Sequence, residues 1–322
     1  MTTPVVQAEH LSKSFPVTRG LLRRTVAELY AVNDVSFEIY PGETLCVVGE
    51  SGCGKSTLGR LVLRLLRPST GRLLIEGEDV TDLPAEQMRR FRRRVQMVFQ
   101  DPYASLNPRL AAGEIVTEPL ENYEHLSKAT RRKRAADLLS RVGLRPELMD
   151  RWPFEFSGGQ RQRLGIARAL SLQPALIVAD EPVSALDVSV QAQVLNLMLD
   201  LQETLGVAYL FISHDLGVVE HIGHRIAVMY LGRIVELADR DALFSSPQHP
   251  YSEALLHAAP VPDPRLRRTR PVIEGETPSL FDPPSGCAFH PRCPYAVATC
   301  KAEVPALQRI ADGRLVACHL RH

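Results

Sequence analysis

A glycine-rich stretch at residues 49–56, GESGCGKS, matches the phosphate-binding pattern G-x-x-x-x-G-K-[ST]. The glycines let backbone N–H groups wrap a phosphate chain, and a helix that starts at the loop adds a favourable dipole. We expect Lys55 to reach the β- and γ-phosphates of ATP and the Ser56 hydroxyl to ligate Mg²⁺. Cys53 fits the loop as a small filler rather than as a reactive thiol. The predicted nucleotide contacts are Gly49, Glu50, Ser51, Gly52, Cys53, Gly54, Lys55, Ser56 and Thr57.

Two acids close a second apolar stretch, ALIVADE, at residues 175–181. Asp180 is placed to hold Mg²⁺, directly or through water, and Glu181 extends one residue further, where it would polarise an attacking water. A carboxylate in this role contributes about 10²–10⁴-fold to a rate. A strand that ends in Asp-Glu is a weak signal alone, but beside a phosphate loop it predicts nucleotide hydrolysis with Lys55 and Glu181 as catalytic residues.

A second anion-binding helix start is predicted in FSGGQRQRLGIARAL, which begins at Phe156. Ser157 suits an N-cap, and Gly158 and Gly159 permit close backbone approach before a helix that runs from about Gln160. One nucleotide does not need two such sites in one subunit. We therefore predict that Ser157–Gln160 serve the nucleotide of another subunit.

The elements that must position these residues alternate along the chain. Short apolar runs at residues 44–50, 95–99, 175–180, 207–213 and 225–230 read as buried strands, and helical patterns separate most of them. One such pattern places Val190, Val194, Leu197, Leu201 and Leu205 on one face, with Gly206 as a stop, and another runs through Leu65 and Leu66. This alternation predicts an α/β domain with a largely parallel sheet. Residues 104–172 break the pattern and are predicted to form a helical insert.

Composition is ordinary for a globular protein, with 45% hydrophobic and 23% charged residues in 322. A net charge of +1 gives no general attraction to nucleic acid, so we expect no such partner. The basic runs at 89–94 and 131–134 read as solvated helix faces or, alternatively, as a docking surface for phosphate or lipid head groups. Neither a targeting segment nor a long apolar run is visible, which favours a cytoplasmic protein that needs a partner to act at a membrane.

These motifs resemble those of the ATP-binding subunits of ABC transporters. FSGGQ is similar to the family's signature motif, with Phe156 where Leu is usual, and SALD at 184–187 is similar to the D-loop, with Asp187 facing the partner's ATP. The resemblance makes Gln100 the Q-loop glutamine and a Mg²⁺ contact, and His214 the catalytic switch histidine. Phe15 matches the aromatic that stacks on adenine. Tyr30 is a rival, because residues 16–30 read as an insertion.

A narrower likeness rests on EPVSALDVSVQAQVLNLM and on HPYSEALLHAAP, in which HPY is residues 249–251. These resemble the dipeptide, oligopeptide and nickel importer group, nearest to the second ATPase subunit of dipeptide permeases. The resemblance implies ATP-driven import of di- or oligopeptides. It also implies a heterodimer with a homologous ATPase, two membrane-spanning permeases, an indirect link to a substrate-binding protein, and a peripheral location at the cytoplasmic face of a bacterial inner membrane.

Three alternatives remain open. The cargo of the same importer group includes nickel chelates and glutathione. A soluble ABC ATPase of DNA repair or translation is a second reading, against which stand the single phosphate loop and the lack of a long heptad run. A kinase-like enzyme is a third, but FSGGQ would then have no role.

The tail combines a proline-rich stretch with a cysteine cluster. Residues 260–284 contain seven prolines and predict a linker at 260–286 between an ATPase domain, 1–259, and a cysteine-rich extension, 287–322, that hangs beyond it. Cys287, Cys293, Cys300 and Cys318 lack the tight knuckle of structural zinc sites and suit an iron–sulfur cluster, while zinc and unliganded thiols remain possible readings. The spacing also resembles the cysteine motif of the dipeptide importer ATPases, which implies a [4Fe–4S] cluster. Such a cluster would supply the cross-links that a tail poor in apolar residues lacks.

Overall fold

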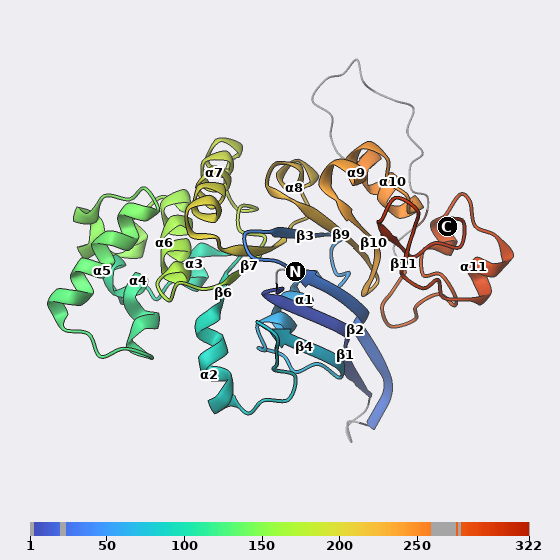
Figure 1. Ribbon diagram of the computed structural model, residues 1–322, viewed down its shortest axis with the longest axis horizontal. Coiled ribbons are helices and arrows are strands. Elements are labelled where there is room, and N and C mark those ends of the chain that lie inside the picture. The colour runs from blue at the N-terminus through green and yellow to red at the C-terminus, as the bar shows by residue number, and fades with distance from the viewer. Residues whose placement is uncertain (1–2, 20–23, 259–274, 276–277, 322) are drawn as a thin grey trace, which may run out of the picture. The chain divides into compact units, whose positions relative to one another are not determined.

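The computed structural model describes residues 3–19, 24–258, 275 and 278–321, which form two compact units (Figure 1). The first, called here the helical unit, comprises the described residues of Met1–Val5, Tyr40–Glu43 and Leu83–Ile212. The second, called the phosphate-loop unit, comprises those of Val6–Ile39, Thr44–Asp82 and Ser213–His322. Each unit is described by itself.

Parallel strands run through the helical unit in the order β6-β7-β8. They are β6 (Val95–Val98), β7 (Leu176–Asp180) and β8 (Ala208–Ile212). Every residue of β7 and β8 is buried, which explains their nearly continuous apolar sequences. The predictions of strands at these places are confirmed, with differences only at the ends.

Every regular element between β6 and β7 is helical. The unit contains α2 (Ala85–Arg94), α3 (Pro102–Ser105), α4 (Ala112–Glu121), α5 (Lys128–Arg141), α6 (Gly158–Leu170) and α7 (Val188–Leu205), with 3-10 turns η1 (Pro146–Asp150) and η2 (Pro153–Glu155). Gly206 ends α7 with a φ of 66°, as predicted. The buried face of α7 is rotated from the predicted one, because Leu195 and Met198 are buried while Leu205 is 43% exposed.

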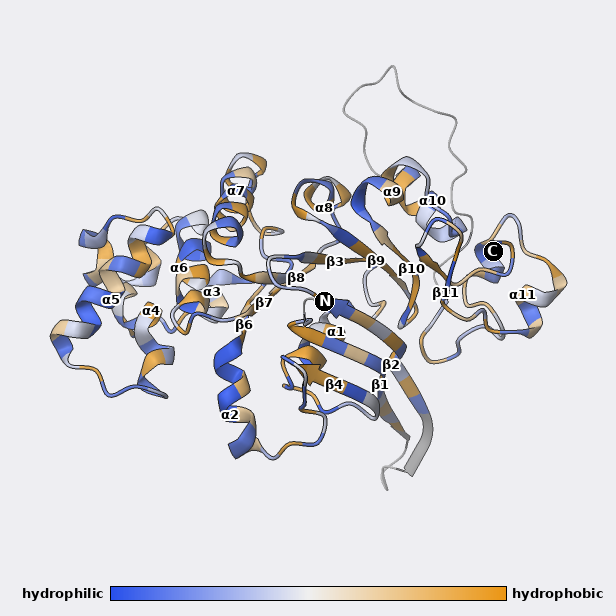
Figure 2. Cartoon of the chain, viewed as in Figure 1, coloured by the Kyte–Doolittle hydropathy of each residue, from blue (hydrophilic) through white to orange (hydrophobic). Residues whose placement is uncertain are grey.

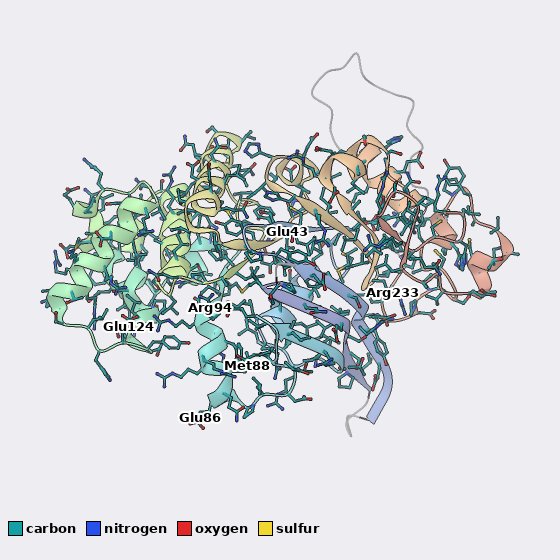
Figure 3. The ribbon with its side chains drawn as sticks, in the orientation of Figure 1. Glu43, Glu86, Met88, Arg94, Glu124 and Arg233 are labelled. Atoms are coloured by element: carbon teal, nitrogen blue, oxygen red, sulfur yellow. The ribbon has the colours of Figure 1, made fainter. Side chains whose placement is uncertain are left out.

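The basic run at 89–94 forms the C-terminal half of α2, a mostly hydrophilic helix in Figure 2. Its apolar side buries Met88 and Phe91, and Arg93 pairs with Glu124 at 3.0 Å (Figure 3 labels Met88 and Glu124). Part of the basic run therefore forms contacts within its own unit. The rest agrees with the interpretation of this run as the solvated face of a helix.

The phosphate-loop unit contains two sheets. In one, β3 (Thr44–Val48) is parallel to β9 (Arg225–Tyr230), which is followed by antiparallel neighbours β10 (Arg233–Asp239), β12 (Leu315–Val316) and β11 (Gln308–Arg309). The other sheet has the antiparallel order β2-β1-β4-β5, from β2 (Arg24–Ile39), β1 (Val6–Arg19), β4 (Thr70–Ile75) and β5 (Glu78–Asp79). The two strands predicted in this unit, β3 and β9, are parallel as expected. The antiparallel strands were not predicted, and β1 mixes polar and apolar residues too irregularly to be read as a strand.

The helices of this unit are α1 (Lys55–Val62), α8 (Leu216–Ile222), α9 (Arg240–Ser245), α10 (Pro250–Ala258) and α11 (Ala298–Ala302), with the 3-10 turn η4 (His290–Arg292). The predicted periodicity to Leu66 overruns the first of these, and Leu65 is 58% exposed. Arg64 ends the helix by taking a φ of 52°, and its Nε donates to the Val80 carbonyl at 2.8 Å. Within the described residues, none of the helices has the length and apolar character needed to cross a membrane.

The cysteine-bearing tail packs against the rest of its unit. β12 pairs with β10, the Ala317 N–H donates to the Val235 carbonyl at 2.8 Å, and Phe289 is 1% exposed. The expectation that the tail hangs free of the rest of the chain is therefore wrong, because strand pairing and aromatic burial hold it within its unit. Most of the predicted linker, residues 260–274 and 276–277, lies outside the described residues.

Candidate nucleotide site

The phosphate loop connects buried β3 to α1, as its motif requires. Gly49 and Gly54 have φ angles of 153° and 105°, and an added Cβ would lie 2.1 Å from the Met229 oxygen and 2.0 Å from the Ala31 oxygen, respectively. Both positions therefore exclude any side chain. Burial raises the pKa of the Cys53 thiol, which agrees with a filler rather than a nucleophile.

Lys55 is 6% exposed and folds back onto its own loop. Its Nζ donates to the carbonyl oxygens of Gly49 at 2.7 Å and Glu50 at 2.9 Å. An ammonium held by carbonyls at the mouth of a phosphate loop is ready to exchange those acceptors for phosphate oxygens. Ser56 and Thr57 follow in the first turn of α1.

The two candidate adenine-stacking residues lie on neighbouring strands of one ribbon. β1 and β2 pair Ser14 with Tyr30 and Phe15 with Leu29, and the described residues 16–19 and 24–30 continue the ribbon. Because successive side chains on a strand point to opposite faces, Phe15 and Tyr30 lie on opposite faces of the ribbon. They are 37% and 43% exposed, respectively. Only one of them can therefore stack on a given base.

The helical unit brings Gln100 and Glu181 together. The Gln100 Nε2 donates to the Glu181 Oε2 at 2.8 Å. Glu181 has a φ of 46°, which is unusual for a residue other than glycine, and its N–H donates to the Ile212 oxygen at 2.9 Å. Asp180 is 7% exposed at the end of β7. Strained backbone held by neighbouring contacts is common at functional sites, and the sequence alone did not reveal it.

The signature helix α6 starts with an exposed capping box. The Ser157 N–H donates to the Gln160 Oε1 at 3.0 Å, and the Gln160 N–H points back to the Ser157 Oγ at 3.4 Å. A Cβ on Gly159 would lie 2.3 Å from Val190 Cγ1, so this glycine lets α6 approach α7. Phe156, directly before this helix, is buried. The N-terminus of a long helix is thus presented at the surface, where an anion from another molecule can reach it.

The D-loop residue Asp187 caps α7 in its own chain. It accepts hydrogen bonds from Ser189 Oγ at 2.8 Å and Val190 N at 3.0 Å, and the Ser189 hydroxyl is the main cause of its lowered pKa. The assigned contact with a partner's ATP therefore has to coexist with this cap. His214 is exposed in the phosphate-loop unit, next to Asp215, which caps α8.

The four tail cysteines lie close enough to influence one another. Burial is the main cause of the raised pKa of Cys287, and the charges of Cys300, Cys318 and Cys293 raise it further. The Cys287 N–H also donates to the Cys300 oxygen at 2.8 Å. Yet no group of three or more His, Cys, Asp or Glu side chains within the described residues could hold a metal ion. The structure therefore gives the iron–sulfur expectation no support.

Two contacts to the phosphate loop were missed in the sequence. Arg292, beside a tail cysteine, pairs with Glu50 at 3.0 Å, and the Tyr251 hydroxyl accepts the Glu50 N–H at 2.9 Å. A carboxylate inside an anion-binding loop was the available signal, because such a group calls for a nearby cation.

Comparisons with known proteins match two family profiles. Residues 32–184 match the ABC transporter family, and residues 235–300 match the oligopeptide/dipeptide transporter C-terminal region.

Among similar proteins, the probable peptide ABC transporter ATP-binding protein y4tS of Sinorhizobium fredii is 63% identical, over 100% of this chain and 91% of that protein. The oligopeptide transport ATP-binding protein AppF of Bacillus subtilis is 51% identical, over 98% and 97% of the respective chains. The dipeptide transport ATP-binding protein DppF of Haemophilus influenzae is 52% identical, over 98% and 96%.

Solved structures agree on the fold. The dimeric ATP-binding cassette MJ0796, in a post-hydrolysis state bound to ADP and Pi, is 31% identical with a TM-score of 0.65, covering 73% of this chain and 98% of that one. CbiO1 from Clostridium perfringens, part of the ABC transporter complex cbiONQ, is 26% identical with a TM-score of 0.66, covering 76% and 92%.

Proposed function

Because this chain belongs to the family of ATP-binding subunits of ABC transporters, we propose that its ATP hydrolysis drives import of di- or oligopeptides through membrane permeases. The observation that carries the peptide assignment is the oligopeptide/dipeptide transporter C-terminal region at residues 235–300 of a chain with an intact phosphate loop. Relatives named for peptide, oligopeptide and dipeptide transport match nearly the whole chain, which supports the same cargo class.

The proposed chemistry assigns each polar group one task. The loop N–H groups and Lys55 hold the ATP phosphates, and the oxygen donors of Ser56, Gln100 and Asp180 suit Mg²⁺, which when bound neutralises charge on the phosphates. Glu181 takes a proton from water while the oxygen of that water forms a bond to the γ-phosphorus. The bond from that phosphorus to the β–γ bridging oxygen breaks, and ADP keeps the electron pair. His214 is proposed to contact the transferred phosphate.

A second ATPase subunit completes the proposed site. Ser157 and Gly158 are exposed at the start of α6, which supports a role of Ser157–Gln160 at the partner's ATP, together with Asp187. We propose a heterodimer with a homologous ATPase that acts on two permeases at the cytoplasmic face of a bacterial inner membrane and receives cargo from a substrate-binding protein. ATP then acts as a ligand that favours the closed dimer.

The proposed domain division is an ATPase domain at 1–259, with a helical insert at 104–172, a linker at 260–286 and a cysteine-rich extension at 287–322. We retain a [4Fe–4S] cluster on Cys287, Cys293, Cys300 and Cys318 as a hypothesis. The hypothesis rests on the four cysteines in the sequence. Burial is the main cause of the raised pKa values of Cys287, Cys293 and Cys318, and neighbouring cysteines raise them further. Anaerobic protein should contain about four iron and four sulfide per chain on this hypothesis. Colourless protein with one zinc would contradict it.

Co-purification tests the transporter assignment. The tagged chain, isolated from its native membranes in mild detergent, should bring two multi-spanning permeases and a second ATPase, identified by mass spectrometry. The peptide assignment predicts that dipeptide with its binding protein stimulates ATP hydrolysis by this complex, whereas nickel chelate or glutathione does not. Nucleic acid in place of permeases would contradict the transporter assignment, and stimulation by nickel or glutathione alone would contradict the peptide assignment.

A further inference from the structure

A carboxylate lies inside the loop that is proposed to bind the triphosphate. Glu50 is the second residue of GESGCGKS, and its two oxygens accept hydrogen bonds from Arg292 NH1 at 3.1 Å and NH2 at 3.0 Å. The Arg292 side chain is 8% exposed and that of Glu50 24% exposed. A two-point guanidinium–carboxylate contact fixes orientation as well as charge. The pair therefore both orients and neutralises an acid that would otherwise repel phosphate.

The backbone of Glu50 is held on both sides as well. Its N–H donates to the Tyr251 hydroxyl at 2.9 Å, and its carbonyl accepts from Lys55 Nζ at 2.9 Å. Arg292 and Tyr251 come from segments far along the chain from the loop. Lys55 and Cys53, whose N–H donates to the Glu50 carbonyl at 3.3 Å, belong to the phosphate loop itself.

An aromatic cluster makes these attachments rigid. The Phe289 ring lies 5.4 Å from Tyr230, 5.4 Å from Tyr251 and 5.8 Å from His249, measured between centroids. Phe289 directly precedes the short turn η4, and Arg292 is the last residue of that turn. Arg292 NH1 also lies 3.4 Å from the Tyr230 hydroxyl. Burial lowers the pKa of His249 to about 3, so the cluster stays neutral near pH 7. The guanidinium of Arg292 is therefore the charged group with which this part of the tail contacts the phosphate loop.

We propose that Arg292 is a positioning residue of the nucleotide site, which makes the cysteine-bearing tail an integral part of the phosphate loop's support. Arg292 cancels the charge of Glu50 and keeps its carboxylate turned away from the phosphates. The inference rests on the proposed binding of ATP at the Lys55 loop. It assigns to the tail a role that needs no metal.

The test measures equilibrium binding of a fluorescent ATP analogue to full-length wild type and variants. All are purified by the same procedure. Arg292→Met should weaken binding about tenfold, because it leaves an uncompensated carboxylate beside the triphosphate. Arg292→Lys keeps the charge but loses the two-point contact, so it should fall between Arg292→Met and wild type. Arg309→Met is the matched control, because that exposed tail arginine contacts the Gly313 oxygen of its own turn.

Glu50→Gln separates charge from folding. In a Glu50→Gln background the Arg292→Met change should cost less than threefold, because the repelling charge is gone. In the assembled transporter, KM for ATP should rise in Arg292→Met while kcat stays within about threefold. If wild type binds the ATP analogue and Arg292→Met binds it equally well, this inference alone is overturned. An equal loss in both backgrounds would show that the arginine only stabilises the fold, and failure of wild type to bind would overturn the proposed function itself.

Discussion

Phe289→Ala should release the cysteine-bearing tail while leaving the rest of the phosphate-loop unit folded. The ring is 1% exposed and contacts Tyr230, Tyr251 and His249 at centroid distances of 5.4–5.8 Å. Truncating a buried phenylalanine to alanine costs about 3–5 kcal/mol. The tail has little other apolar burial, chiefly Cys300, Val316 and Ala317, so this loss should fall mainly on local opening.

Hydrogen exchange measures that opening directly. A loss of 3–5 kcal/mol corresponds to roughly 10²–10⁴-fold faster exchange, expected at backbone amides of residues 287–317 such as that of Ala317. Phe281→Ala is the control, since Phe281 is 66% exposed and its loss should change little. Unchanged protection across the tail, or an equal loss of protection in β3 and α1, would refute the docking argument.

Three further outcomes follow from the proposed site. Glu181→Gln should retain ATP binding but lower turnover at least 100-fold, since it removes the base that accepts the water proton; hydrolysis within a few-fold of wild type, measured by phosphate release, would rule out that role. Ser157→Arg should block hydrolysis at the partner's ATP while ATP binding to its own Lys55 loop survives, so loss of its own binding alone would contradict the role in trans. The isolated chain should hydrolyse ATP slowly with a rate per chain that rises with concentration, and fast, concentration-independent turnover would contradict the two-subunit site.

Contiguous motifs were predictable because one short segment contains all the needed information. The phosphate loop depends on local backbone conformation and on the strand and helix beside it, and Gly49 and Gly54 occupy the positions where a Cβ would clash. The same holds for Ser157, whose capping box with Gln160 is a local contact. The buried parallel strands were predictable because burial on both faces requires an apolar run.

Contacts between distant segments were not predictable from pattern. Arg292 and Glu50 are 242 residues apart, and each looks unremarkable until the tail brings them together. The antiparallel sheet was missed because β1 is stabilised by pairing with β2 and β4 rather than by a clear alternation of its own. Likewise, α1 ends before the predicted position, where Arg64 takes a φ of 52° and bonds to the distant Val80 carbonyl. Helical periodicity in the sequence gives no sign of this contact.

ATP-dependent uptake of a labelled dipeptide into proteoliposomes tests the central claim most directly. The vesicles would contain this chain, its companion ATPase and both permeases, with ATP on the side of the ATPases and the binding protein on the other. The account predicts uptake that requires ATP and is lost with Glu181→Gln, although that variant still binds ATP. Uptake that proceeds equally with Glu181→Gln, or an active complex that moves no peptide, would contradict it.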